Sequence, residues 1–303
     1  MSVVSYGPTL GKVFGDTVYT DGLDLGPDEK HMVHIPGPII EGEIDRRVRR
    51  MEAEDRWLAR NNGNLDVTLR EAAAIGSLAC VEFLLSTDPR VAAVDIHAQE
   101  DLPLRNAAFS GSPDVVRLLL DRGADIHTQD DDPLCTASAY GRLEVVRLLL
   151  DRGANIHAQE DRALHGAAFT GHLEVVRLLL DRGANTHAQE DRALREAAST
   201  GHLEVVRLLL DRGANIHVGN DSVLRIAARQ GHLDVVRLLL DRGADIHAQN
   251  NTALWIAAGY GRLEVVRLLL DRGAHTHVEA LRFARFNGHA ATVALLLERG
   301  AIG

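Results

Sequence analysis

The stretch that decides the fold is GHLEVVRLLLDRGAN, which occupies residues 171–185 and returns letter for letter at 201–215. The tetrapeptide DRGA within it starts every 30 residues from Asp121 to Asp271. A fixed period of this length is typical of solenoid and array proteins, in which each copy packs only on its neighbours. The sequence therefore predicts a stack of similar modules.

Each module has the pattern of two helices, which we call helix A and helix B. In one copy of helix A, the apolar residues Leu194, Ala197 and Ala198 follow the i, i+3, i+4 spacing of a single helix face. Helix B, within 202–212, is aliphatic except for one narrow polar stripe, which indicates a helix covered on several sides. A glycine follows each helix and supplies the left-handed residue that ends it. Neither helix can bury its apolar side alone, so the modules need their neighbours.

The composition bounds the class of protein. Hydrophobic residues make up 46% of the 303 residues and charged residues 25%, as in folded soluble proteins, and aromatic residues make up only 4%. The net charge of −10 argues against nucleic-acid binding, which needs clustered Lys and Arg. The two cysteines, the lack of a signal peptide pattern and the absence of an apolar run of about 20 residues predict a cytoplasmic protein that does not bind membranes. We further expect it to be monomeric.

The pattern L-x-x-A-A-x-x-G-H-L-E-V-V-x-L-L-L-x-x-G-A, from Leu194 to Ala214, resembles the ankyrin repeat. The usual ankyrin period is about 33 residues with a T-P-L-H opening. This chain instead has R-A-L-R or R-A-L-H, and its missing residues fall at the hairpin tip. The resemblance implies an all-α solenoid of helix–turn–helix repeats with shortened β-fingers. The short period is similar to that of ankyrin repeats from large DNA viruses of amoebae, which would place the protein in the host cytoplasm.

The chain divides into three parts. Residues 63–303 are the predicted array, with atypical first and last repeats, as expected where one side of a repeat faces solvent. Residues 1–40 are predicted to be an irregular segment of unknown role. Residues 41–62 have the spacing of an amphipathic helix, which we interpret as an N-terminal cap on the array; the alternative is a docking helix for a separate partner. Eight helix pairs are counted from the helix-A leucines Leu69, Leu104, Leu134, Leu164, Leu194, Leu224, Leu254 and Leu281.

Two polar positions recur in every linker between modules. An aspartate or asparagine lies three residues before each helix-A leucine, from Asp101 to Asn251, where its side chain is predicted to cap the helix start. A histidine recurs from His97 to His277. Stacked copies should lie about 10 Å apart, whereas zinc ligands lie about 2 Å from the metal, so this row cannot share an ion. These histidines are predicted to bond neighbouring backbone.

No catalytic motif is recognisable in the chain. It contains no phosphate-binding loop, nucleophile elbow or dinucleotide fingerprint, so no catalytic residue and no cofactor are predicted. His31 and His34 have a spacing that metal ligands use, but one His-x-x-His pair is a weak signal, and no metal site is predicted. The sequence therefore favours a protein that is not an enzyme.

Candidate binding residues lie where nearly identical copies differ. The largest variation is five and six residues after each helix-A leucine, at positions that in ankyrin proteins line the concave groove together with the finger tips. Exposed aromatic residues in a groove are common binding anchors, although neutral drift in a recently duplicated array would also produce variation. The predicted partner-binding residues are Phe109, Ser110, Tyr140, Phe169, Thr170, Thr200, Arg229, Gln230, Tyr260, Asp131, Glu160 and Glu190.

The expected function is therefore a scaffold that binds a partner protein through the concave helix-A surface and the finger tips. The acidic finger tips of the first repeats would steer a partner that carries a basic patch. One alternative is an adaptor, such as a client receptor of a ubiquitin ligase, with residues 1–62 as the recruiting segment; the array would then offer no acceptor, since Lys12 and Lys30 are the only lysines. A further alternative is an enzyme or metal protein that uses residues 1–40.

Overall fold

The computed structural model describes residues 55–56, 58–275 and 278–301, together with the backbone of four short strands nearer the N-terminus. Contacts divide the chain into two compact units, residues 1–68 and 69–303, which we describe separately. The strands form an antiparallel sheet in the first unit, which the sequence did not suggest. The other residues of 1–40, predicted to be irregular, lie outside the described part. In sheet order the strands are β1 (Val4–Ser5), β2 (Lys12–Phe14), β3 (Thr17–Val18) and β4 (Val33–His34).

Only the end of the predicted helix at 41–62 is described. Residues 55–56 and 58–59 are helical, and the short 3-10 helix η1 (Arg60–Gly63) follows. Asn64 then accepts a hydrogen bond from the backbone N–H of Val67 at 3.1 Å, which satisfies one free donor at the start of the next helix. The role of 41–62 as a cap stays a prediction.

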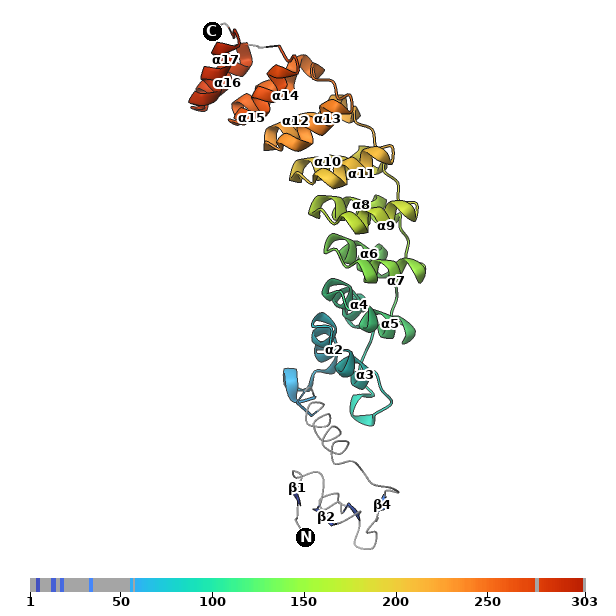
Figure 1. Cartoon of the computed structure of the whole chain (residues 1–303). Coiled ribbons are helices and arrows are strands. Elements are labelled where there is room, and N and C mark those ends of the chain that lie inside the picture. The colour runs from blue at the N-terminus through green and yellow to red at the C-terminus, as the bar shows by residue number, and fades with distance from the viewer. Residues whose placement is uncertain are drawn as a thin grey trace. The chain divides into compact units, whose positions relative to one another are not determined.

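The second unit is built from helices that alternate between type A and type B. Together with α2, whose first turn belongs to the first unit, these helices form the eight predicted pairs within the described residues (Figure 1). The helix-A elements are α2 (Leu65–Ala74), α4 (Ala98–Ser110), α6 (Thr128–Ala139), α8 (Ala158–Thr170), α10 (Ala188–Thr200), α12 (Val218–Gln230), α14 (Ala248–Gly259) and α16 (Val278–Phe286). The helix-B elements are α3 (Leu78–Leu84), α5 (Pro113–Asp121), α7 (Leu143–Asp151), α9 (Leu173–Asp181), α11 (Leu203–Asp211), α13 (Leu233–Asp241), α15 (Leu263–Asp271) and α17 (Ala290–Glu298). A 3-10 turn, η2 (Pro89–Val91), lies in the insertion after α3.

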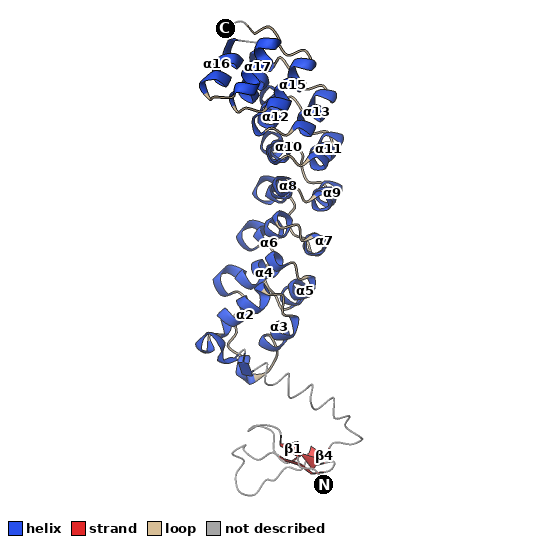
Figure 2. Cartoon of the chain, turned by 60° about the vertical axis from the view of Figure 1, so that its left-hand side comes forward, coloured by secondary structure: helices blue, strands red, loops and turns tan. Residues whose placement is uncertain are grey.

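The pairs stack in chain order. From α4 onward, each helix A packs on the helix A of the next pair and on its own helix B, and the helices B pack on one another, so that the two types form two rows (Figure 2). The core between the rows is aliphatic, as the low aromatic content predicts. Leu164 and Leu179, for example, are 1% and 0% exposed. The α-solenoid predicted from the repeat is confirmed.

The predicted shortened fingers are short left-handed turns, and the described part of the array contains no strand. Gln159, Glu160 and Asp161 have φ angles of +50°, +57° and +60°, three consecutive residues in the left-handed region. The same conformation recurs directly after the first residue of each helix A from α4 to α14. A 30-residue period leaves too little chain for a hairpin, so the linker turns back within one left-handed turn.

The aspartate row joins adjacent repeats, and the prediction that it caps its own helix was wrong. Asp161 is 5% exposed, and its Oδ1 accepts a hydrogen bond from the backbone N–H of Asn185, in the next repeat, at 2.7 Å. The ring of His157 also meets this carboxylate, with Nδ1 at 3.2 Å from Oδ1, where backbone was predicted as its partner. His277 lies outside the described residues. The equivalent bridges join Asp101 to Asp125, Asp131 to Asn155, Asp191 to Asn215, Asp221 to Asp245 and Asn251 to His275.

A second contact joins the end of each helix A to the next repeat. Gly171 ends α8 with φ +82°, and the ring of His202 lies so close that a Cβ on Gly171 would be 2.5 Å from it. Nε2 of His202 is 3.1 Å from the carbonyl oxygen of Phe169. In another copy Arg142 replaces the histidine, and its Nε donates to the carbonyl of Phe109 at 2.9 Å. The glycine thus permits the close approach that fixes the end of helix A.

Candidate functional site

The helix-A face is the surface formed by the outward side chains of α4 to α16. In each helix A the leucine and two alanines are buried, as Leu164, Ala167 and Ala168 are in α8. The residues between them and after them, such as His165 and Phe169, are therefore turned away from the core. One copy after another adds a row of such residues to the face.

Exposed aromatic rings lie at the ends of the first helices on this face. Phe109 and Tyr140 are 43% and 51% exposed, and their rings meet edge to face with centroids 4.5 Å apart. Phe169, one repeat further on, is 50% exposed. We call these three residues the aromatic cluster. The backbone carbonyls of Phe109 and Phe169 are bonded to the next repeat, so the backbone that carries these two rings is fixed before any partner arrives.

The predicted hydroxyl residues are occupied within their own helices. Ser110 donates to the carbonyl of Ala107 at 2.9 Å, Thr170 to that of Gly166 at 3.0 Å, and Thr200 to that of Glu196 at 2.9 Å. Such bonds to the preceding turn are usual for Ser and Thr in helices. These residues shape the face without presenting free hydroxyl donors.

Arg229, Gln230 and Tyr260 lie further along the face, and all three are exposed. The guanidinium of Arg229, from α12, lies over the ring of Tyr260, at the end of α14, with its carbon 5.0 Å from the ring centroid. A cation over a tyrosine face is attracted by the negative face of the ring. The arrangement brings a positive charge and an aromatic surface together.

The predicted acidic residues separate into two groups. Glu160 and Glu190 are exposed in the left-handed turns, as a finger-tip contact requires. Asp131 is only 3% exposed, and its Oδ1 bonds the backbone N–H of Asn155 at 2.8 Å. Its place among the binding residues was therefore wrong: the side chain is taken up by the next repeat.

The structure brings together a polar pocket that the sequence analysis missed. This central pocket has a volume of about 570 Å³ and is lined by residues of α4, α6, α8 and α10. Nε of Arg105 donates to Oδ2 of Asp132 at 2.7 Å at one side, and Arg192 pairs with Glu196 at 3.3 Å at the other. Burial, and then the charge of Arg192, lower the pKa of His165, so its neutral form is favoured.

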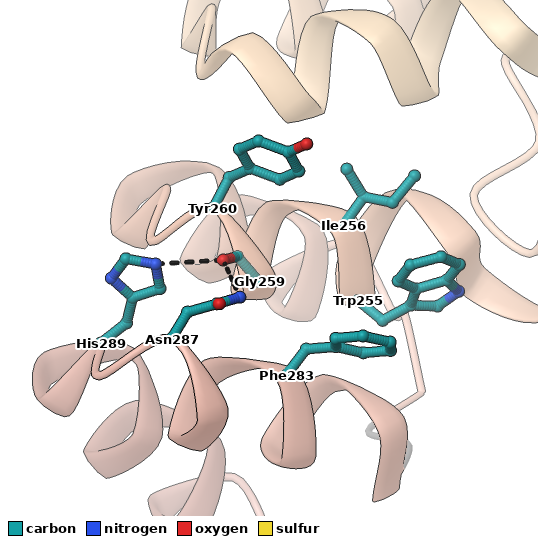
Figure 3. A pocket seen from close by; sticks show the side chains of 7 residues that line it. All are labelled: Trp255, Ile256, Gly259, Tyr260, Phe283, Asn287 and His289. Atoms are coloured by element: carbon teal, nitrogen blue, oxygen red, sulfur yellow. Dashed lines mark hydrogen bonds between the residues drawn. The ribbon is translucent and has the colours of Figure 1, made fainter.

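A second pocket, which we call the C-terminal pocket, also has a volume of about 570 Å³ and lies between α14 and α16 (Figure 3). The rings of Trp255 and Phe283 stack with centroids 5.3 Å apart and planes 21° from parallel. Its lining residues are Trp255, Ile256, Gly259, Tyr260, Phe283, Asn287 and His289.

Nine of the 19 residues that line the two pockets stand one or two positions after a helix-A leucine. The copies differ there as well: Arg105, Cys135, His165 and Trp255 occupy one register. The comparison between copies that found the aromatic cluster would have found them too, had it covered the whole turn.

The described residues contain no group of three or more His, Cys, Asp or Glu side chains placed to hold a metal ion. None of their helices combines the length and the hydropathy that crossing a bilayer requires. The His31 and His34 side chains lie outside the described part.

Comparison with known proteins agrees with this geometry. A family model described as ankyrin repeats (3 copies) matches residues 57–130, 134–220, 164–250, 194–280 and 224–302. Among solved structures, the human ASB11 ankyrin repeat domain superposes with a TM-score of 0.59 at 26% sequence identity. That match covers 66% of this chain and 99% of the other. No curated protein matches the sequence.

Proposed function

Because the chain belongs to the ankyrin repeat family, we propose that it binds a partner protein through the helix-A face. Ankyrin repeats mediate protein–protein interactions, and the fold is typically a scaffold without enzymatic activity. The proposal adds the surface and the residues: the aromatic cluster as anchors, with Glu160 and Glu190 at its edge.

The distribution of exposed aromatic side chains carries this proposal. Among the described residues, every exposed aromatic side chain lies on a helix A or at its end; the one described aromatic residue of a helix B, Phe83, is 5% exposed. Burying such rings against a partner contributes more than most contacts, because aromatic anchors combine large area with few rotatable bonds. The helix-B surface instead presents pairs such as Glu174 and Arg177, 3.5 Å apart, which suit contact with water.

Charge supports a partner with a basic patch next to this cluster. The left-handed turns at the start of α4 and α6 carry Glu100 and Asp130, both exposed, and Glu160 and Glu190 continue the series. Charges of one sign along an edge raise the association rate of an oppositely charged surface. Weaker capture at high salt is the expected sign of this contribution.

The test replaces Phe109, Tyr140 and Phe169 with alanine in the full chain. Proteins that the wild-type chain captures in its native cell are identified first, and the main partner is then titrated against both chains. We expect the affinity to fall at least about a hundredfold, as for loss of several anchor residues. A matched control replaces Glu144, Arg147 and Glu174, exposed on helices B, with alanine, and should bind like the wild type. Unchanged capture by the first variant would refute the assignment of the surface.

A further inference from the structure

The C-terminal pocket lies where one copy has no side chain and the others do, and a Cβ on Gly259 would be 3.3 Å from the Cβ of Phe283 in the next repeat. Gly259 stands in the same register as Phe109 and Phe169, whose rings fill this position on the face. Around the glycine, Tyr260, Ile256 and Phe283 leave a hollow (Figure 3). The face therefore changes character here: it offers a place for a ring or an aliphatic group from another molecule.

The floor of the pocket selects an apolar occupant. The carbonyl oxygen of Gly259 accepts a hydrogen bond from Nδ2 of Asn287 at 2.8 Å, and Nε2 of His289 lies 3.0 Å from the same oxygen. A carbonyl has two lone pairs, and both are taken. Trp255 and Phe283 supply aromatic walls, and an apolar side chain gains by leaving water against such walls.

The surroundings of the pocket are basic, in contrast to the start of the array. Helices α12, α14 and α16 carry four arginines and two carboxylates, of which Asp221 is only 5% exposed. Helices α4 and α6 carry one arginine and five carboxylates, of which Asp101 and Asp131 are likewise buried. Arg229 covers the outer ring of the pocket, Tyr260, and Arg282 directly precedes Phe283 and is exposed. Charge on the helix-A face thus changes sign along the array.

We propose that the C-terminal pocket binds an acidic segment of a partner protein, with one large apolar side chain of that segment seated over Gly259. Carboxylates on both sides of this side chain pair with Arg229 and Arg282. A basic segment is disfavoured because the arginines repel it. The proposal rests on the proposed function and deepens it: it adds a second contact region, of opposite charge preference to the aromatic cluster.

The test uses three synthetic peptides of equal length, each labelled with fluorescein. The first has a central leucine between aspartates and glutamates, the second has lysines in place of the acids, and the third has serine in place of the leucine. Binding to the full chain is measured by fluorescence anisotropy. In a Trp57→Phe variant, Trp255 is the single tryptophan of the chain, and its emission reports whether the peptide reaches the pocket.

Two pairs of variants identify the pocket residues that matter. Gly259→Phe restores the ring of other copies and fills the hollow, whereas Gly259→Ser, the residue of Ser199, adds the same Cβ and leaves most of the space open. Arg229→Glu with Arg282→Glu reverses the charges. Arg177→Glu with Arg237→Glu makes the same change of net charge on helices B.

We expect the acidic leucine peptide to bind and to shift Trp255 emission, and the lysine and serine peptides to bind at least about tenfold more weakly. Gly259→Phe and the Arg229–Arg282 variant should each weaken binding by a similar factor, and their controls should not. Equal binding of the serine peptide, binding that survives both variants, or no binding of any peptide would overturn the proposal. In the last case the scaffold proposal still stands if partner capture depends on the aromatic cluster. If the variant without the aromatic cluster still captures its partner, only the assignment of the aromatic cluster as the binding surface is refuted.

Discussion

One buried polar side chain in each linker from α4 to α14, an aspartate in all of them but one, joins its own turn to the next repeat. Asp161 stands at the end of a left-handed turn, meets the ring of His157 in the same turn, and bonds the backbone of Asn185 in the next repeat. Glutamine, glutamate and aspartate are uncommon in three consecutive left-handed positions, since such residues are strained there. The bonds of the buried aspartate, or of Asn251 in its place, stabilise this conformation in every linker described from α4 to α14.

Asp161→Ala should therefore destabilise the array. The change removes the acceptor of the Asn185 N–H and the partner of His157, and we expect the free energy of unfolding to fall by about 1–3 kcal/mol. Urea unfolding followed by circular dichroism measures it. Asp161→Asn is the matched control: Asn251 fills this position naturally, with Oδ1 3.2 Å from the backbone nitrogen of His275. Equal losses for both variants would contradict the acceptor role.

Cys135 is expected to resist alkylation in the folded protein. Burial raises the pKa of its thiol from 9.0 to about 12, so near pH 8 it carries about a thousandfold less thiolate than an ordinary thiol. Iodoacetamide labelling, read for this residue by peptide mass spectrometry, should rise with pH without a plateau up to pH 10, and unfolded protein should react fast. Rapid labelling of the native protein at pH 8 would contradict this.

At the scale of an element, two glycines per repeat end helices for different reasons. Gly171 and Gly183 have φ angles of +82° and +98°, where any residue with a Cβ is strained. A Cβ on Gly171 would also meet the ring of His202, whereas Gly183 has no atom of another segment within 4 Å. The first glycine thus permits packing between repeats, and the second serves only its own turn.

Gly171→Ala should cost at least about 1 kcal/mol more than Gly183→Ala in the free energy of unfolding. Both variants strain the backbone by about 1–2 kcal/mol, but only the first displaces His202 from the carbonyl of Phe169. Thermal or urea unfolding of the pair compares the two. If Gly183→Ala were the more harmful change, the contact with His202 would not limit residue choice at 171.

The helices could be predicted from the sequence, and the linkers between them could not. Periodic leucines and alanines predict the helix pairs, because the apolar pattern alone determines which side is buried. The conformation of the linkers was harder to predict. A left-handed turn is normally recognised in a sequence by its glycine, whereas here Gln159 to Asp161 adopt this turn through contacts with another repeat. Asp131 looked like an exposed finger-tip acid for the same reason. Its burial depends on a partner 24 residues away.

For the whole molecule, the stack makes the effect of a core change depend on its place. Leu164 and Leu281 are each 1% exposed and occupy the same register, but Leu164 has repeats on both sides and Leu281 lies in the last described pair. In a linear array, stability is close to a sum of repeat and neighbour terms. The destabilisation caused by the same mutation should therefore extend over more repeats at Leu164 than at Leu281.

Replacing either leucine with alanine should cost about 2–5 kcal/mol of local stability. Hydrogen exchange followed by mass spectrometry should show faster exchange from α6 to α10 for Leu164→Ala, and only from α14 to α17 for Leu281→Ala. Faster exchange over the entire array in both variants would show a single cooperative unit instead of coupled repeats.

The binding face was predicted in part. Variation between copies located the aromatic cluster, Arg229 and Tyr260, because these positions differ within otherwise identical text. The pockets were not found, because one is made from two helices and the other from four. The hollow over Gly259, for example, depends on Phe283 and Asn287 from the following repeat. A missing side chain leaves no signal until its neighbours are placed.

The bond that joins the ends of five helices A to the next repeat has a consequence for how binding preference can change. The acceptors are the carbonyls of Phe109, Phe169, Ser199, Arg229 and Gly259, which are four different types of residue. Since the next repeat bonds only to the main-chain oxygen at this position, the bond does not depend on which side chain the residue carries. Copies can thus be duplicated, and their displayed groups exchanged one by one, while the framework that aims them stays intact. New binding preferences can therefore arise in such a protein without compensating changes at the contacts between repeats.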